Sequence, residues 1–169
     1  MMDSLYLRVY PDPVLRKETK PVTDFGDGFK DLVADLVRLM DQHDGVGLAA
    51  PQVGVSLRLA VVFYQGELHV LANPVLVSSE GEQDGEEGCL SFPGIFGNVK
   101  RPMKATVRHF DINGEEKETV VEDFLARAFL HEMDHLEGRL LIDRFSPLKR
   151  SMAKKKLLRA VAEREEERV

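Results

Sequence analysis

The pentapeptide His131-Glu132-Met133-Asp134-His135 constrains the fold of this 169-residue chain more than any other stretch. Successive residues of an α-helix lie about 100° apart, so two histidines four positions apart differ by only about 40° around the helix axis. A helix through residues 121–138 would therefore point both imidazoles at one metal ion, with Glu132 able to reach a metal-bound water. The alternative is a pair of hydrogen-bonded core histidines, with Glu132 and Asp134 on a solvated face.

A metal on two histidines needs a third ligand, and the longer pattern H-E-x-x-H-x-x-G-x-x-H fails here because position 141 is leucine. The other histidines, His43, His69 and His109, lie in a polar helix end and in strand-like runs, which favours surface or strand-face positions. Cys89, the only cysteine, is a better candidate, because one thiolate and two imidazoles leave the fourth tetrahedral position open to water. The alternatives for Cys89 are a small buried apolar residue or a nucleophile beside a histidine.

Hydrophobic periodicity predicts the remaining elements. An amphipathic helix is expected over 29–45, and a charged C-terminal helix over about 148–169. Strands are expected over 4–10, 58–64 and 68–77, the last broken at Asn73-Pro74, and a hairpin over 104–121 with a tight turn at Asn113-Gly114. Residues 80–87 are expected to form an acidic loop. The sequence therefore predicts one α+β domain over residues 1–169, with mostly antiparallel strands packed around a central metal-binding helix, and with an N-terminal and a C-terminal helix.

Composition narrows the class of protein. The chain is 43% hydrophobic and 31% charged, which fits a soluble globular domain, and its single cysteine excludes an internal disulfide. No run resembles a signal peptide or approaches the roughly 18 apolar residues of a membrane span. We therefore expect a cytosolic protein without a membrane partner. The net charge of −6 argues against nucleic acid as the main ligand, so direct DNA binding is not expected.

The glycine-rich stretch 45–54, Gly-Val-Gly-Leu-Ala-Ala-Pro-Gln-Val-Gly, matches the G-x-G-x-x-A spacing of dinucleotide-binding loops. Its context is wrong for that function, because it follows a predicted helix and runs into Pro51 instead of following a strand and opening a helix. The glycines would instead let the backbone approach a ligand closely, and Gln52 could offer an amide donor to a developing oxyanion. A simple turn between a helix and a strand remains the alternative.

Three segments together, "GVGLAAPQ", "EGCLS" and "HEMDH", resemble in their order and gaps the signature motifs of peptide deformylases. The segments "YPDPVLRK" and "LEGRLLIDRFSPLKR" are also similar to that family, so the resemblance covers nearly the whole chain. It implies a hydrolase that removes the N-formyl group from the initiator methionine of newly synthesised proteins and releases formate. A bacterial cytoplasmic enzyme is the expected setting.

The resemblance also implies residue roles. Cys89, His131 and His135 would bind the catalytic metal, one divalent ion per chain, with Fe2+ expected and Zn2+, Ni2+ or Co2+ able to occupy the site. Glu132 would act as general base and then as general acid.

Further roles concern the substrate. The Gln52 side chain and the backbone N–H of Leu90 would form the oxyanion site. The backbone of Val46, Gly47 and Gly88 would hold the peptide groups of a formyl-methionyl substrate as a short added strand.

The methionine side chain needs an apolar pocket, and Val46, Phe124 and Ala128 are candidate walls, with ordinary core packing as the alternative. Arg127 stands where an aliphatic pocket residue is expected, and it could rim the pocket and adjust substrate choice. Leu130 replaces the glutamine that often precedes the helix motif in the family. Glu87 either pairs with Arg101 at the edge of the site or is a solvated charge like its partner.

The tail from Leu148 onward carries eight Lys/Arg and four Glu, a net charge of +4. Some deformylases approach the ribosome through a C-terminal helix, and a basic patch would suit RNA phosphates. The alternative is a solvated helix held by charge pairs four residues apart.

Overall fold

The computed structural model describes residues 5–167, except for the side chains of 164–167. Its main sheet has five antiparallel strands in the order β1-β2-β3-β6-β7. The strands are β1 (Gly47–Ala49), β2 (Leu59–Tyr64), β3 (Glu67–Glu80), β6 (Lys104–Phe110) and β7 (Glu116–Glu122). The predicted strand over 58–64 and the predicted hairpin are confirmed. Strand β1 lies at one edge of the sheet.

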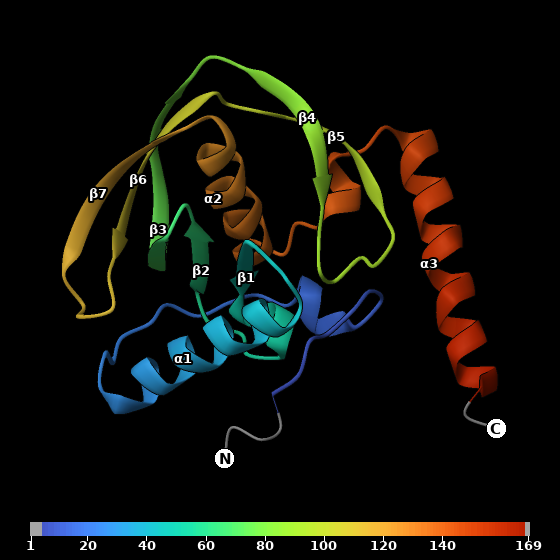
Figure 1. Cartoon of the computed structure of the whole chain (residues 1–169), viewed down its shortest axis with the longest axis horizontal. Helices are drawn as coiled ribbons and strands as arrows, with labels where there is room; N and C mark the ends of the chain where they lie inside the picture. Colours follow the sequence, from blue (N-terminus) through green and yellow to red (C-terminus); the bar gives the residue numbers. More distant parts are fainter. Residues whose placement is uncertain (1–4, 168–169) are drawn as a thin grey trace.

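A second, two-stranded sheet pairs β4 (Gln83–Gly88) with β5 (Phe96–Arg101). The long β3 and β6 lead directly into this ribbon, because Glu80 pairs with Lys104 and Gln83 pairs with Arg101. Figure 1 shows the two connected arms arching over the helix in the centre of the molecule. The prediction of a loop over 80–87 is therefore wrong, since Glu80 ends β3 and residues 83–87 belong to β4.

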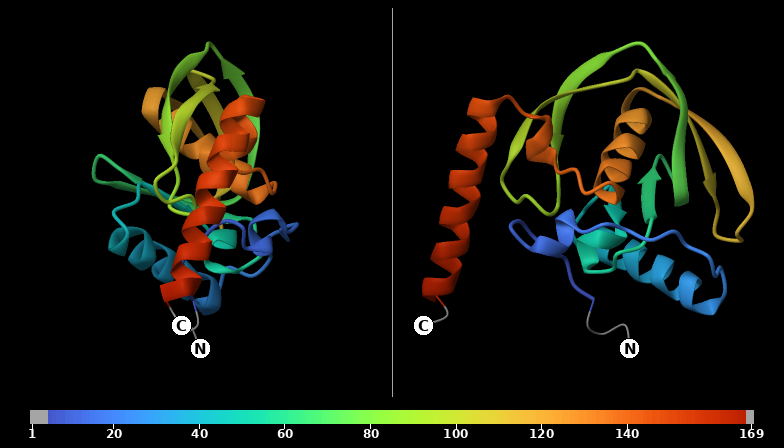
Figure 2. Two further views of the ribbon diagram at one scale, coloured as in Figure 1. Left: turned by 90° about the vertical axis from the view of Figure 1, so that its right-hand side faces the viewer. Right: turned by 180° about the vertical axis from the view of Figure 1, so that it is seen from behind.

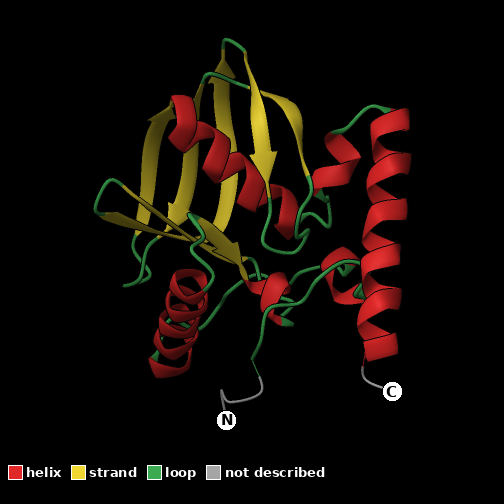
Figure 3. Ribbon diagram, turned by 45° about the vertical axis from the view of Figure 1, so that its right-hand side comes forward, coloured by secondary structure: helices red, strands yellow, loops and turns green. Residues whose placement is uncertain are grey.

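The helix α2 (Asp123–Leu136) lies inside this arch and carries the pentapeptide, as Figures 1 and 3 show. Its buried Ala126, Phe129 and Leu130 form one core cluster with strand residues of β2, β3, β6 and β7, among them Leu71 and Val107. Burial of such side chains stabilises the fold by about 25 cal/mol per Å2 of apolar surface removed from water. The predicted central helix is thus confirmed, and its apolar back anchors it to the sheet.

Two further helices flank this core. Helix α1 (Asp27–Gln42) buries Phe29, Leu32 and Leu36 in a separate cluster below β1 and β2. Helix α3 (Pro147–Glu167) runs along one side of the molecule, as the two views in Figure 2 show, and it buries Ala153 and Leu157. The predicted N-terminal and C-terminal helices are confirmed. The expected domain limits, 1–169, include residues 1–4 and 168–169, which lie outside the described residues.

Three local predictions need correction. Residues 5–10 form no strand, because their backbone hydrogen bonds go to the 3-10 helix residue Gln52 and to Ser91 and not to a β ladder. Strand β3 is not broken at Asn73 but bulged, with Asn73 at φ 51° and its side chain bonded to the Val22 backbone. The hairpin turn spans 111–115 and is not a two-residue turn, because Asp111 accepts hydrogen bonds from the N–H groups of Asn113 and Glu115.

Across residues 5–167, no helix combines the length and the apolar character that a membrane crossing requires.

Candidate metal centre and active site

A cavity of about 750 Å3 opens between β1, the β4–β5 ribbon and α2. The residues predicted to act in the site are spread over 46–135 in sequence, and all except His135 line this cavity. They are Val46, Gly47, Gln52, Gly88, Cys89, Leu90, Phe124, Arg127, Ala128, His131 and Glu132. His135 lies deeper and is 1% exposed.

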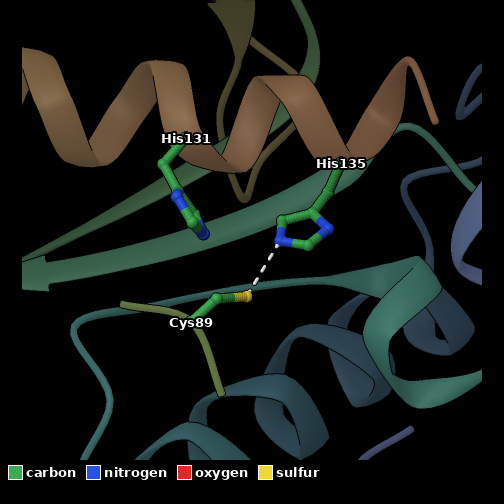
Figure 4. A group of neighbouring side chains, drawn as sticks. All are labelled: Cys89, His131 and His135. Carbon is green, nitrogen blue, oxygen red and sulfur yellow. Dashed lines mark hydrogen bonds between the residues drawn. The ribbon is translucent and has the colours of Figure 1, made fainter. Parts of the chain in front are cut away.

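The side chains of Cys89 and the two helix histidines face one another (Figure 4), and Cys89 and His131 also line the cavity. Cys89 follows the last residue of β4, and its Sγ lies 3.3 Å from Nε2 of His135. One ligand atom from each of Cys89, His131 and His135 falls within 4.8 Å of the others, and within the described part of the chain no other group of His, Cys, Asp or Glu does so. The structure thus gathers one sulfur and two imidazole nitrogens from two elements, which is a donor set suited to a transition metal.

A buried ion-pair network contacts His131 at its Nδ1 atom. Nδ1 of His131 lies 3.0 Å from Glu87, whose carboxylate also accepts two hydrogen bonds from Arg101, at 2.8 and 2.9 Å. Arg101 in turn donates to Asp134 at 2.7 Å. Glu87 and Arg101 are 6% and 4% exposed, so the paired alternative holds and the solvated one does not. This network fixes the imidazole of His131 with Nε2 turned away from Glu87.

The pKa shifts of the two histidines show what the cluster favours. Burial lowers the pKa of His131, but the charge of Cys89, hydrogen bonds with Cys89 and Glu87, and the charge of Glu132 raise it well above its ordinary value. Burial and the positive charges of His131 and Arg101 lower the pKa of His135 well below its ordinary value. The surroundings therefore favour one positive charge among these ligand atoms. A divalent cation would supply that charge without a proton, so the residues fit a bound metal.

Glu132 points into the cavity from the turn between the two histidines. Glu132 is 5% exposed, and its Oε1 has no hydrogen-bond partner among the residues that the structure describes. Burial raises the pKa of Glu132 to about 7. A Cβ atom at Gly47 would lie 2.5 Å from Oε2 of Glu132, so glycine is required there for the carboxylate to keep its position. The group is placed and tuned to carry a proton near neutral pH.

Gln52 lies opposite, in the 3-10 helix Ala50–Val53 that follows β1. Its Oε1 accepts a hydrogen bond from Ala49 N–H at 2.9 Å, and its Nε2 lies 3.5 Å from Sγ of Cys89. The Leu90 N–H has no acceptor within residues 5–167. Two N–H donors thus border the cluster.

The candidate pocket residues differ in their surroundings. Ala128 is buried, whereas Phe124 is 41% exposed and its ring lies 4.9 Å from that of Tyr64. Arg127 lines the cavity, but it is 6% exposed and its guanidinium donates to Glu87 at 2.6 Å and to Val99 O at 2.9 Å. Leu130 does not line this cavity and belongs to the core cluster of α2.

Four further residues, not assigned to the site from the sequence, line or support this cavity. Leu7 and Val9 of the N-terminal segment line it, although they lie far from the motifs in sequence. Phe96 covers Gly88 so closely that a Cβ atom there would lie 2.5 Å from its ring. Ser91 is fully buried and bonded to Gln52 at 3.1 Å. The first three carry no pattern that a sequence would reveal, whereas Ser91 stands inside the "EGCLS" motif.

Comparison with known proteins places this geometry in a family. The family model described as polypeptide deformylase matches residues 5–151. A peptide deformylase from Caldanaerobacter subterraneus is 52% identical over 139 residues, which cover 82% of this chain and 87% of that protein. One from Thermotoga petrophila is 46% identical over 153 residues, covering 90% and 93%.

Solved structures agree with this relationship. A peptide deformylase from Legionella pneumophila superimposes with a TM-score of 0.90 at 44% identity, covering 95% of this chain and 96% of that one. The chain therefore belongs to the polypeptide deformylase family, the metal-dependent hydrolases that remove the N-formyl group from nascent peptides.

Proposed function

We propose that this chain removes the formyl group from N-formylmethionine of newly synthesised proteins, with Glu132 as general base and acid, and with Cys89, His131 and His135 as metal ligands. The observation that carries the proposal is the unpartnered buried oxygen of Glu132 beside the sulfur and imidazole cluster, inside one cavity. The general base needs a free carboxylate oxygen there, and a purely structural glutamate would have its oxygens paired.

The three ligands would hold one divalent ion, and we propose Fe2+ as the native one. When bound, such an ion supplies Lewis acidity, which polarises a carbonyl group and makes hydroxide available near neutral pH. A thiolate ligand suits iron, zinc, nickel or cobalt. Metal analysis of protein purified without oxygen from iron-replete cells should find about one iron per chain, and an excess of zinc would overturn the assignment.

Glu132 would carry the proton through the reaction. Its carboxylate takes a proton from the attacking water at Oε1 and returns it to the leaving amine, and a pKa of about 7 suits both transfers. Formate and a free α-amine are then released.

The oxyanion would be met by two donors from this chain, Nε2 of Gln52 and the N–H of Leu90. The Gln52 amide already lies against Cys89 Sγ, and the Leu90 N–H is free within the described residues. Such donors act in a site with little water, where each contributes more than it would in solution.

The substrate would enter as an extra strand beside β1. Strand β1 forms the edge of its sheet, and the Val46 and Gly47 backbone lines the cavity opposite Gly88 at the end of β4. Peptide groups would bond to these three residues, and the methionine side chain would lie against Val46, Phe124, Ala128 and the stem of Arg127.

We further propose that the partner is the emerging nascent chain in the bacterial cytoplasm, and that α3 approaches the ribosome. In support, Lys155, Lys156 and Arg159 are exposed on α3. Co-sedimentation with ribosomes at low and high salt tests this, and a Lys155→Glu, Arg159→Glu variant that binds as well as the wild type would leave α3 as a solvated helix.

Formate release from a formyl-Met tripeptide tests the main proposal. The activity should vanish with a chelator, return with metal, and be lost in Cys89→Ala. Cleavage of the same peptide without its formyl group would indicate a metallopeptidase instead. A fully metallated protein that releases neither product would indicate a non-catalytic relative.

A further inference from the structure

The N-terminal segment is hydrogen-bonded to residues of the candidate active site. Arg8 N–H donates to Gln52 O at 2.7 Å, and Tyr10 N–H donates to Ser91 O at 2.9 Å. Between these two bonds, Oγ of Ser91 donates to Arg8 O at 2.7 Å. Residues 8–10 therefore hold Gln52 and Ser91 together, which explains why this segment forms no strand.

The hydroxyl of Ser91 has a defined direction. A serine hydroxyl has one proton to donate and two lone pairs to accept with. Because that proton goes to Arg8 O, the 3.1 Å contact between Ser91 Oγ and Gln52 Nε2 must be a hydrogen bond that Gln52 donates. Ser91 is 0% exposed, so water does not compete for either bond.

The amide of Gln52 is oriented in the same way. Its Oε1 accepts from Ala49 N–H at 2.9 Å, which leaves the NH2 group on the side of Ser91 and Cys89. Of the two amide hydrogens, one is taken by Ser91. The other is donated to Cys89 Sγ at 3.5 Å, a long contact between two side chains that line the cavity.

From this chain of bonds we infer that Ser91 is a positioning residue for the oxyanion donor: it accepts one hydrogen of the Gln52 amide and thereby holds the other beside Cys89 at the cavity, where the reacting carbonyl oxygen would lie. The Arg8 carbonyl fixes Ser91 by accepting its only proton. The inference rests on the proposed function of Gln52, and it adds a residue that itself touches neither the substrate nor the metal.

The test separates positioning from packing. Loss of a whole oxyanion donor lowers kcat by about 10²–10³. In Ser91→Ala the Gln52 amide would remain but would be wrongly oriented, so kcat on a formyl-Met tripeptide should fall by about tenfold. KM should stay within about twofold, because ground-state binding does not use this hydrogen. Metal content after gel filtration should equal that of the wild type.

A double-mutant cycle provides the decisive readout. The Gln52→Ala variant has no side-chain amide for Ser91 to orient. Adding Ser91→Ala to it should therefore change kcat by less than about twofold. An equal loss in both backgrounds would overturn the inference and leave Ser91 a packing residue. Thr119→Val is the matched control, since it removes a hydroxyl bonded to buried His109 at 2.8 Å in β6 and β7, outside the cavity. It should lower the melting temperature while leaving kcat unchanged.

A second variant decides the matter if Ser91→Ala does not fold. Ser91→Thr keeps the hydroxyl, and its kcat should stay within about threefold of the wild type, whereas a loss as large as that of Gln52→Ala would overturn the inference. Failure of the proposed function itself is distinguishable, because the wild-type protein would then release no formate.

Discussion

Nδ1 of His131 lies 3.0 Å from Oε1 of Glu87, and the same carboxylate accepts hydrogen bonds from Arg101 and Arg127. Burial raises the pKa of Glu87, but hydrogen bonds from Arg101 and His131 outweigh it and lower the pKa below its ordinary value. The carboxylate stays charged, keeps the hydrogen of His131 on Nδ1, and leaves Nε2 as the ligand atom.

Replacing Glu87 by glutamine should therefore weaken metal binding by about 10–100-fold. It should also lower the free energy of unfolding by about 3–5 kcal/mol, because buried Arg127 would lose its carboxylate partner and Arg101 would keep only Asp134. Competition with a metal indicator and denaturant unfolding measure the two effects. Glu82→Gln, at an exposed position of the β3–β4 connection, is the control. Unchanged metal affinity in Glu87→Gln would contradict the role given to this carboxylate.

Replacing Glu132 by glutamine keeps the shape of the side chain and removes its ability to take a proton. Formate release should fall by about 10²–10⁴-fold, the usual contribution of a general base. The metal content should remain that of the wild type, because Glu132 is not in the ligand cluster. Turnover near the wild-type rate would remove Glu132 from the mechanism.

Gly47→Ala should inactivate the protein through Glu132, since the added Cβ would lie 2.5 Å from its Oε2. We expect a loss of kcat approaching that of Glu132→Gln, with metal still bound. Gly28→Ala is the matched control, because a Cβ there meets nothing within 4 Å in helix α1. It should leave kcat intact and stabilise the fold by about 0.5–1 kcal/mol. Equal activity of the two variants would contradict the prediction and show that the backbone at residue 47 can shift to accommodate a Cβ atom without displacing Glu132.

Acid should destabilise the fold through His109, which is 4% exposed. Burial lowers its pKa, against the opposing effect of hydrogen bonds with the backbone of Phe110 and Val70, while His69 and Lys117 add to the lowering. The unfolded chain then binds a proton that the folded chain does not, as soon as the pH falls below the ordinary histidine pKa of about 6.5. Stability from this residue is full above that pH and declines below it.

Urea unfolding of the wild type and of His109→Gln between about pH 8 and pH 5 measures this contribution. The difference in unfolding free energy between the two proteins should shrink as the pH falls. A difference that is constant across the range would show that His109 titrates alike in both states.

The sequence predicted best those elements whose local pattern of apolar and polar residues is regular. The helix of His131 and His135, helix α1 and the β6–β7 hairpin follow from periodicity. Donor chemistry made Cys89 the candidate third ligand, and the family resemblance then assigned it that role. Periodicity did not predict β4, because this strand shows no apolar alternation. Its buried residue, Glu87, is charged and is paired with buried Arg101. Residues 5–10 show the alternating pattern of a strand, yet their backbone groups form hydrogen bonds with Gln52 and Ser91. Such pairings are set by tertiary contacts, which local patterns do not contain.

Cys89 and His135 stand 46 residues apart in the chain and touch only when the β4–β5 ribbon closes over α2. An unfolded polypeptide cannot offer these ligands to one ion together, so an ion on this cluster binds the native state alone. At a free concentration one hundred times its dissociation constant, such an ion stabilises the fold by about 2.7 kcal/mol. The supply of metal in a cell would thus influence how much of the protein survives proteolysis, and scarcity of metal would lower its abundance as well as its activity.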